Sequence, residues 1–356
     1  MNVSVIQSNC TPLCFLPSNK LVAYSLGKII IFNNGQKERE YHIFNDYKEC
    51  FLGRSKWLFR LLRLGIRSAI ALDENNILIS KSNYIYEFNL ATGCISNGFN
   101  CGQGIRPLIF TNINNIDTFE NGIYFGGYLS NREKNPVSIY RRKDKDKWEI
   151  VYTFSKDSIN HIHNIVPDHY RNCVWIFTGD FDKSAGIWRA SNNFKKIEYF
   201  AGNDQKYRGC IAFSLKEGLL YATDAPFADN YIYMMDPITA EVRQLLAIDG
   251  SCIYGCRWKD NYVFSSTVEG DGRNTSRTEF YFGRKRGAGI KNKFVHLYLG
   301  HPSRGFKEEY KLKKDSMPYY TFQFGVFKFP YGDNIGEHLY FQPIGTSKND
   351  LKLLKI

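Results

Sequence analysis

The sequence predicts an all-β protein, a seven-bladed β-propeller, with six blades as the alternative. Short strand-type runs occur in pairs along the chain, and each pair opens and closes on a polar or aromatic residue. The clearest pairs join 66–67 to 80–81, 105–106 to 127–128, 161–163 to 179–180, 207–208 to 223–224 and 253–254 to 268–269. The pairs recur roughly every 40 to 65 residues, within or just above the period of four-stranded propeller blades. Aromatic residues make up 16% of the chain, which suits strands and a large core.

Seven segments are expected to form the blades. They are 21–41, 67–90, 106–154, 161–200, 208–246, 251–299 and 319–356. In the fourth segment, the runs 163–166, 173–178, 185–190 and 196–200 are the expected strands from the inner to the outer edge. Because only closure of the ring removes the exposed edges of the end blades, a strand near one terminus should pair with strands near the other.

One segment, 54–67, departs from the β pattern. Lys56, Arg60, Arg63 and Arg67 follow one another at the spacing of one helix face, and Trp57 and leucines cover the rest. This pattern predicts a short inserted basic amphipathic helix that caps the propeller. The alternative interpretation is that the segment from Lys56 to Arg67 contacts an anionic membrane surface.

The chain is expected to form one domain, 1–356, because no linker-like stretch divides it. The N-terminus does not resemble a signal peptide, and no apolar run is long enough to span a bilayer. The nine cysteines are scattered without CxxC pairs, which favours reduced thiols over a zinc site. We therefore expect a cytoplasmic protein without metal or cofactor, peripheral to the inner membrane in the alternative interpretation.

The net charge of +12 predicts attraction to a polyanion. Nucleic acid, anionic lipid and acidic polysaccharide all fit this charge. No helix-turn-helix, zinc-finger or RNP pattern is present, so nucleic acid is not an expected partner. An acidic oligo- or polysaccharide is preferred.

The polar residues of the strand pairs predict a functional site at the centre of the ring. In an antiparallel pair, the start of the first strand lies beside the end of the second, so each blade brings two polar residues to one edge. An arginine fork matches a carboxylate, so several arginines at this edge favour an anionic sugar. The expected substrate-binding residues are Arg67, Arg106, Tyr128, Arg208 and Glu269, and the expected catalytic residues are His161, His163, Tyr207, Tyr254, Asp180 and Asp224.

Two pairs within this set allow more than one chemistry. His161 and His163 alternate with Ile162, so in a strand they point the same way and can supply a general base, a two-histidine metal site or core hydrogen bonds. Asp180 and Asp224 hold the same place in successive blades. Paired carboxylates serve glycoside hydrolysis, but a repeated structural turn would place them in the same way.

Several motifs resemble those of carbohydrate-active propellers with Asp-box (BNR) repeats, namely the sialidase-like and polysaccharide-lyase propellers. They are YFGGY at 124–128, HIH at 161–163, WIFTGD at 175–180, QKYR at 205–208 and YATD at 221–224. The turn at 191–195 is similar to a degraded Asp-box, with Asn193 where Asp is usual. The resemblance covers about 106–269.

This resemblance implies an enzyme acting on a uronate- or nonulosonate-containing glycan. A lyase-type β-elimination, with a histidine base, a tyrosine acid and arginines on the carboxylate, is favoured because a sialidase has no place for the HIH pair. The alternatives are a sialidase-like hydrolase that uses Asp, Glu and Tyr, and a non-catalytic glycan-binding or scaffold propeller in surface-polysaccharide synthesis. The lack of an export signal counts against extracellular degradation.

Overall fold

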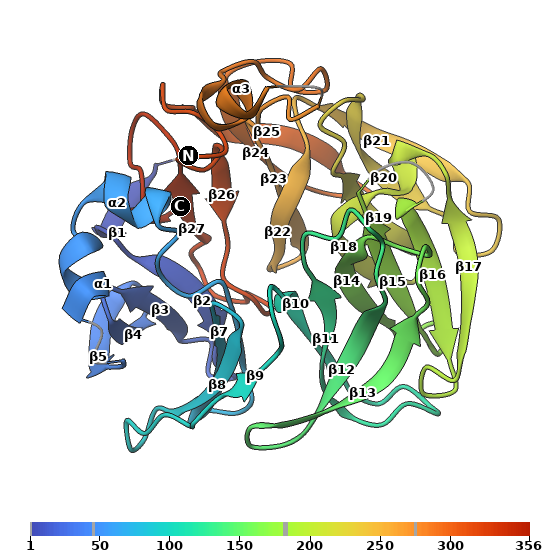
Figure 1. The fold of residues 1–356 in the computed structure, drawn as a ribbon, viewed down its shortest axis with the longest axis horizontal. Helices are drawn as coiled ribbons and strands as arrows, with labels where there is room; N and C mark the ends of the chain where they lie inside the picture. Colours follow the sequence, from blue (N-terminus) through green and yellow to red (C-terminus); the bar gives the residue numbers. More distant parts are fainter. Residues whose placement is uncertain (1, 45–46, 181–183, 274–275) are drawn as a thin grey trace.

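The computed structural model describes residues 2–44, 47–180, 184–273 and 276–356. These residues form seven four-stranded antiparallel sheets that follow one another around a central axis (Figure 1). The prediction of an all-β, seven-bladed propeller is confirmed, and the six-bladed alternative is wrong. In each sheet the strand nearest the axis begins the blade.

The first four blades, each from its inner to its outer strand, are β2(Thr11–Phe15), β3(Leu21–Ser25), β4(Lys28–Asn33) and β5(Gln36–His42); β6(Ser68–Ala71), β7(Asn76–Lys81), β8(Tyr84–Asn89) and β9(Phe99–Asn100); β10(Arg106–Ile113), β11(Gly122–Tyr128), β12(Val137–Asp144) and β13(Lys147–Phe154); and β14(His161–Asp168), β15(Cys173–Gly179), β16(Gly186–Ser191) and β17(Lys196–Gly202). The last three are β18(Gly209–Leu215), β19(Gly218–Thr223), β20(Asn230–Met235) and β21(Val242–Ile248); β22(Cys252–Trp258), β23(Asn261–Ser266), β24(Phe294–His301) and β25(Gly305–Lys313); and β26(Val326–Lys328), β27(Tyr340–Ile344), β28(Leu353–Lys355) and β1(Ser4–Gln7).

The ring closes through its two termini. Strand β1 is the outer strand of the last blade, where Ser4 pairs with Lys355 and Val5 with Leu354. The N- and C-termini accordingly lie close together in Figure 1. The expected pairing between strands near the two ends of the chain is confirmed.

Buried aromatic and aliphatic side chains fill the spaces between blades. Between the fourth and fifth blades, Trp175, Phe177 and Tyr221 are each fully buried in one apolar cluster. Burying such a side chain contributes about 1.5–3 kcal/mol relative to leaving it exposed. The packed blades therefore form a rigid support for polar residues near the axis.

The inserted segment is helical over a shorter range than its spacing predicts. Helices α1(Tyr47–Leu52) and α2(Lys56–Leu61) lie beside the first blade, and the Ser55 hydroxyl caps α2 by accepting from the amide of Leu58. Arg63 follows the helix with a positive φ of 51°. The predicted helix therefore ends before Arg63 and Arg67.

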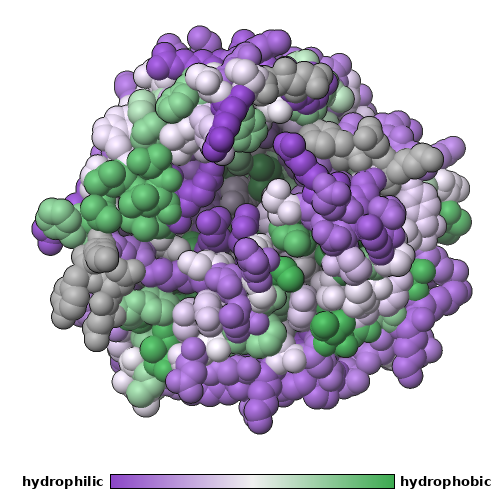
Figure 2. Space-filling view, viewed as in Figure 1, coloured by the Kyte–Doolittle hydropathy of each residue, from purple (hydrophilic) through white to green (hydrophobic). Residues whose placement is uncertain are grey.

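The predicted basic face of this helix is wrong. Arg60 is fully buried and pairs with Asp315 and Asp350, while the Arg63 guanidinium donates to the carbonyl of Tyr320 at 2.8 Å. Apolar side chains are exposed here as well, namely Phe51, Trp57, Leu61 and Leu62 (Figure 2, green, left), beside the exposed Arg54, Lys56 and Arg63. Membrane contact by this segment thus loses the basic face on which the expectation rested. Among the described residues, no helix has the length and apolar character to cross a bilayer.

Candidate functional site

Backbone bulges redirect one side chain in each of the inner strands of blades four and five. The register of β14 with β15 shifts between Ile162 and Asn164, and that of β18 with β19 shifts between Gly209 and Ile211. The extra residues are His163 and Cys210, respectively. A bulge redirects a side chain and is common beside active sites, and here both side chains join one polar cluster near the axis.

The histidine pair is the centre of this cluster. The Nε2 atoms of His161 and His163 are 3.0 Å apart, and Oδ1 of Asp180 lies 3.2 Å from the first and 3.5 Å from the second. Nδ1 of His161 is 2.9 Å from the carbonyl of Leu129, and Nδ1 of His163 is 3.2 Å from that of Gly209. The two histidines are 4% and 2% exposed, so they lie behind the surface of the site.

Arg208 joins the two aspartates predicted from the sequence. Its Nη2 donates to Oδ1 of Asp180 and to Oδ2 of Asp224, each at 3.1 Å. The thiol of Cys210 donates to the same Asp224 oxygen at 3.3 Å. Asn230 holds the loop after Asp224 through hydrogen bonds to the backbone of Ala225.

The surroundings push the pKa values of these groups apart. Burial raises the pKa of Asp224 to about 7. Burial would also raise the pKa of Asp180, but its contacts with the two histidines and the charge of Arg208 outweigh this and hold the pKa well below its usual range. Burial lowers the pKa of His163 to about 4, so this histidine is neutral near pH 7.

A second group of residues gives the site a cationic side. Burial, together with the like charges of Arg106 and Arg63, lowers the pKa of Arg67. Within the described part of the chain, none of these three arginines forms an ion pair, whereas Arg208 forms two. Like charges gathered without a counter-charge indicate a place for an anion.

Two tyrosines connect the cationic side to the histidine side. The guanidinium of Arg106 lies 5.3 Å from the ring centre of Tyr128, and this ring lies 4.4 Å from that of His161. Tyr254 is close enough to Arg67 and Cys210 for their charges to affect its pKa, which burial raises. All these side chains lie around the axis, at the end of the ring where the inner strands begin. We call this group the funnel: Arg63, Arg67, Arg106, Tyr128, His161, His163, Asp180, Arg208, Cys210, Asp224, Tyr254 and Glu269.

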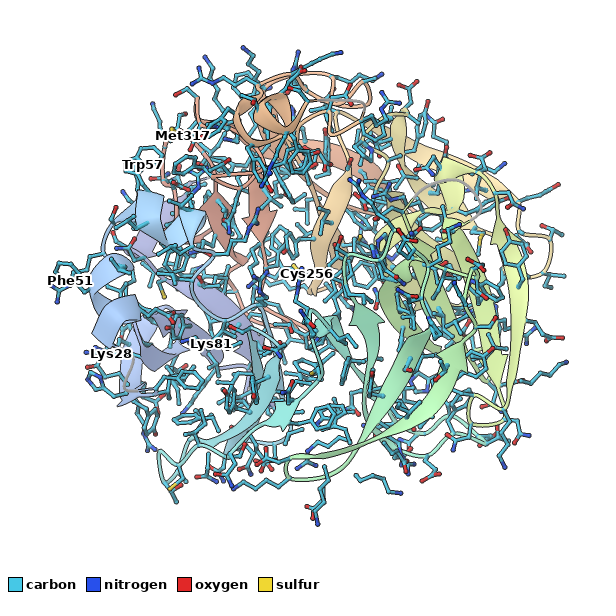
Figure 3. The ribbon with its side chains drawn as sticks, in the orientation of Figure 1. Lys28, Phe51, Trp57, Lys81, Cys256 and Met317 are labelled. Carbon is cyan, nitrogen blue, oxygen red and sulfur yellow. The ribbon has the colours of Figure 1, made fainter. Side chains whose placement is uncertain are left out.

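The funnel adjoins a channel along the axis. This cavity of about 250 Å³ is lined mainly by apolar residues of the inner strands, with Arg67, Tyr254 and Lys328 among the polar ones. Cys256 of β22 marks the centre of the ring in Figure 3, and hydrophilic side chains surround the central hollow in Figure 2. A ligand that enters from this end would therefore meet polar groups first and the apolar channel behind them.

Of the predicted site residues, the structure brings all but one into the funnel. Tyr207 is the exception, because its hydroxyl donates to the carbonyl of Ala240 at 3.1 Å and its ring packs in the core between blades. It lies in the short 3-10 helix η2(Gln205–Tyr207), where strand alternation does not apply. Tyr207 therefore lies outside the funnel, and this position does not support its predicted catalytic role.

The position of Glu269 also differs in detail. The sequence pairs the start of β22 with Val268 and Glu269, but Tyr254 faces Ser265 instead. Glu269 lies beyond the strand, accepts from the Thr267 hydroxyl at 2.8 Å, and is near enough to act on the pKa values of Arg208 and Asp224. It is thus at the edge of the funnel.

Sequence reasoning missed three nearby groups. Cys210 follows Arg208 by two residues, as His163 follows His161, so the repeat contained the signal. Lys328 interrupts an apolar strand, and burial lowers its pKa to about 7. Arg63 has no sequence signal, because its helical spacing points to α2 rather than to the funnel.

Comparison with known proteins shows the fold alone. No family model and no curated protein matches the chain. Among solved structures, it is similar to the propeller domain of Cps50 (Swd1) from Myceliophteria thermophila, with a TM-score of 0.53 and 8% identity over 100% of this chain and 99% of that one. It is also similar to a chain of the mitotic checkpoint complex, with a TM-score of 0.56 and 8% identity over 99% of this chain and 92% of that one. The AfRom2 CNH domain matches with a TM-score of 0.54 and 6% identity over 100% of this chain and 99% of that one. None of these comparisons supports the sialidase-like or lyase-like classification, which stays a prediction.

Proposed function

We propose that the funnel binds a carboxylate-bearing sugar and cleaves an acidic glycan by β-elimination. The observation that carries this proposal is the group formed by Arg63, Arg67 and Arg106, three clustered cations without an ion-pair partner among the described residues. A uronate carboxylate would supply the missing charge and would accept bidentate hydrogen bonds from an arginine fork.

The residues beside these arginines suit acid–base chemistry. In β-elimination, an arginine stabilises the enolate, a base removes the proton alpha to the carboxylate, and an acid protonates the leaving oxygen. Because the histidines are buried, we assign the base to Tyr128, which takes the alpha proton after its own proton has passed to the neutral His163 beside it. Tyr254, beside Arg67, is the acid that protonates the leaving oxygen.

The arrangement of the two aspartates favours a hydrolase as the second candidate. One nitrogen of Arg208 contacts an oxygen of Asp180 and an oxygen of Asp224, so these oxygens are at most about 6 Å apart, close to the spacing in retaining glycosidases. In that reaction Asp224 and Asp180 would take the acid and nucleophile roles, with Glu269 beside them. Both candidates use the same anionic sugar.

Assays on a panel of uronate and sialic-acid polysaccharides separate the candidates. A lyase releases a 4,5-unsaturated uronate that absorbs in the near ultraviolet, whereas a hydrolase releases saturated reducing ends. Sugar binding without either product would indicate a non-catalytic glycan-binding propeller. The absence of both binding and products across the panel would contradict the proposal.

Arg67→Gln should weaken binding of a uronate oligosaccharide about 10- to 100-fold in calorimetry, because it removes a charged hydrogen-bond donor. Arg257→Gln is the matched control. Arg257 lies at the other end of β22, is about half exposed and pairs with Asp333, so its substitution should leave the affinity unchanged. Equal effects of the two substitutions would argue against the cationic side as the binding site.

A further inference from the structure

The hydrogen bonds of the two buried histidines leave their other nitrogens facing each other. A carbonyl oxygen only accepts, so the bonds to Leu129 and Gly209 require a proton on Nδ1 of each ring. In a neutral imidazole, Nε2 then carries a lone pair. Both Nε2 atoms therefore direct lone pairs at each other across 3.0 Å, with an oxygen of Asp180 on the same side. Arg208 donates to this oxygen at 3.1 Å, but the two Nε2 lone pairs repel each other unless a cation or a proton lies between them.

The spacing of these three atoms suits a metal ion. Zinc binds histidine nitrogen at about 2.0–2.1 Å and carboxylate oxygen at about 2.0–2.2 Å, which puts neighbouring ligand atoms about 3.0–3.5 Å apart. The three separations between the His161, His163 and Asp180 ligand atoms are 3.0, 3.2 and 3.5 Å. The atoms are therefore already arranged as one face of a coordination shell.

The neighbouring groups complete the features of such a site. Metal-bound histidines usually donate their other N–H to a carbonyl or carboxylate, which fixes the ring orientation, and both rings do so here. The guanidinium of Arg208 is shared among Asp180, Asp224 and Glu269, so Asp180 does not have this cation to itself.

We propose that His161, His163 and Asp180 bind one divalent first-row transition-metal ion, with zinc as the reference metal. Two histidines and one carboxylate occupy three positions and leave the others open to water or a ligand. The ring of Tyr128 lies over His161 on the funnel side. An ion at this position would act as a Lewis acid toward an anionic ligand in the funnel. The site is argued from geometry and does not depend on the proposed reaction.

A proton is the competing occupant of the same space. If one ring were doubly protonated, it could donate from Nε2 to the other ring and to Asp180 without a metal.

The chain also contains a comparison cluster, Asp249, His296 and Glu308. There the two nitrogens of His296 contact different acceptors, Glu308 on one side and Asn292 on the other. This cluster has no facing lone pairs and should not bind a metal tightly.

The test uses the whole chain, stripped with a chelator and titrated with Zn²⁺ in calorimetry without any sugar. We expect one equivalent to bind, at least 100-fold more weakly in His163→Gln, and unchanged in His296→Gln. Circular dichroism and the melting temperature establish that each variant is folded. Because no sugar is present, failure of this experiment is distinguishable from failure of the proposed glycan chemistry.

A measurement on the unmodified protein avoids reliance on variants. Co²⁺ added to the stripped chain should give the visible absorption of a low-coordinate nitrogen–oxygen site, and excess Zn²⁺ should abolish it. A wild-type chain that binds neither ion would overturn the proposal and indicate a shared proton. Binding retained in full by folded His163→Gln, or lost in His296→Gln, would also overturn it.

Discussion

Single side chains in this protein take roles that depend on burial as much as on spacing. Arg60 has the spacing of an exposed basic helix face, yet its guanidinium is enclosed and contacts Asp315, Asp350 and the carbonyl of Phe322. These contacts attach helix α2 to the loops that precede and follow the last blade's inner strands. Arg60 is therefore a structural residue.

Arg60→Ala should lower the free energy of unfolding by about 3–5 kcal/mol, because it leaves Asp350 buried without its cation and Asp315 with Lys314 alone. Denaturant unfolding measures this change. Lys56→Ala, on the exposed surface of the same helix, is the control and should alter stability by less than about 0.5 kcal/mol. Similar losses in the two variants would contradict the structural role of Arg60.

The alternation of side-chain directions along a strand predicts part of the funnel. It gives the wrong direction for a side chain where the backbone leaves the strand. His161, Arg106 and Tyr128 lie at regular strand ends, where the pairing of Arg106 with Tyr128 is the one expected from the sequence. Tyr207 lies in a 3-10 turn, which rotates its side chain into the core. No pattern of polar residues reports such a turn, so Tyr207 could not be separated from its neighbours by sequence alone.

At the scale of elements, blades with four complete strand runs were predictable, and blades with weak runs were not. The third, fourth and fifth blades match their expected ranges closely. The inner strand β2 was missed because the first blade was read from Leu21, and β9 consists of only two residues. In the sixth blade, an insertion that contains helix α3(Arg277–Phe282) separates β23 from β24, so the outer strand β25 lies beyond the expected end of the blade at 299.

Strand β28 carries the closure of the ring, since it lies between β1 and β27. Deleting 351–356 should therefore lower the melting temperature of the entire protein in a single transition. The single substitution Leu354→Ala should lower the free energy of unfolding by about 2–5 kcal/mol, because Leu354 is fully buried. Lys352→Ala, at a half-buried position, is the control and should lower this free energy less. An unchanged melting temperature after the deletion would show that the ring does not depend on this closure.

At the scale of the molecule, the propeller concentrates charge of both signs around one axis. The inner strands begin at the same end of the ring, so residues far apart in sequence, such as Arg67 and Arg208, meet in the funnel. The net charge of +12 predicts attraction to a polyanion but not where it binds. The proposed binding location depends on the ring, because an isolated blade would not bring these arginines together.

Binding of an anionic sugar in the funnel can be tested directly in a crystal structure of the chain soaked with an acidic disaccharide. We expect the sugar to occupy the funnel, with its carboxylate within hydrogen-bonding distance of the guanidinium groups of Arg67 and Arg106 and a ring hydroxyl near Tyr128. Sugar bound at the Arg257 end of the channel, or no sugar in the funnel at saturating concentration, would contradict it.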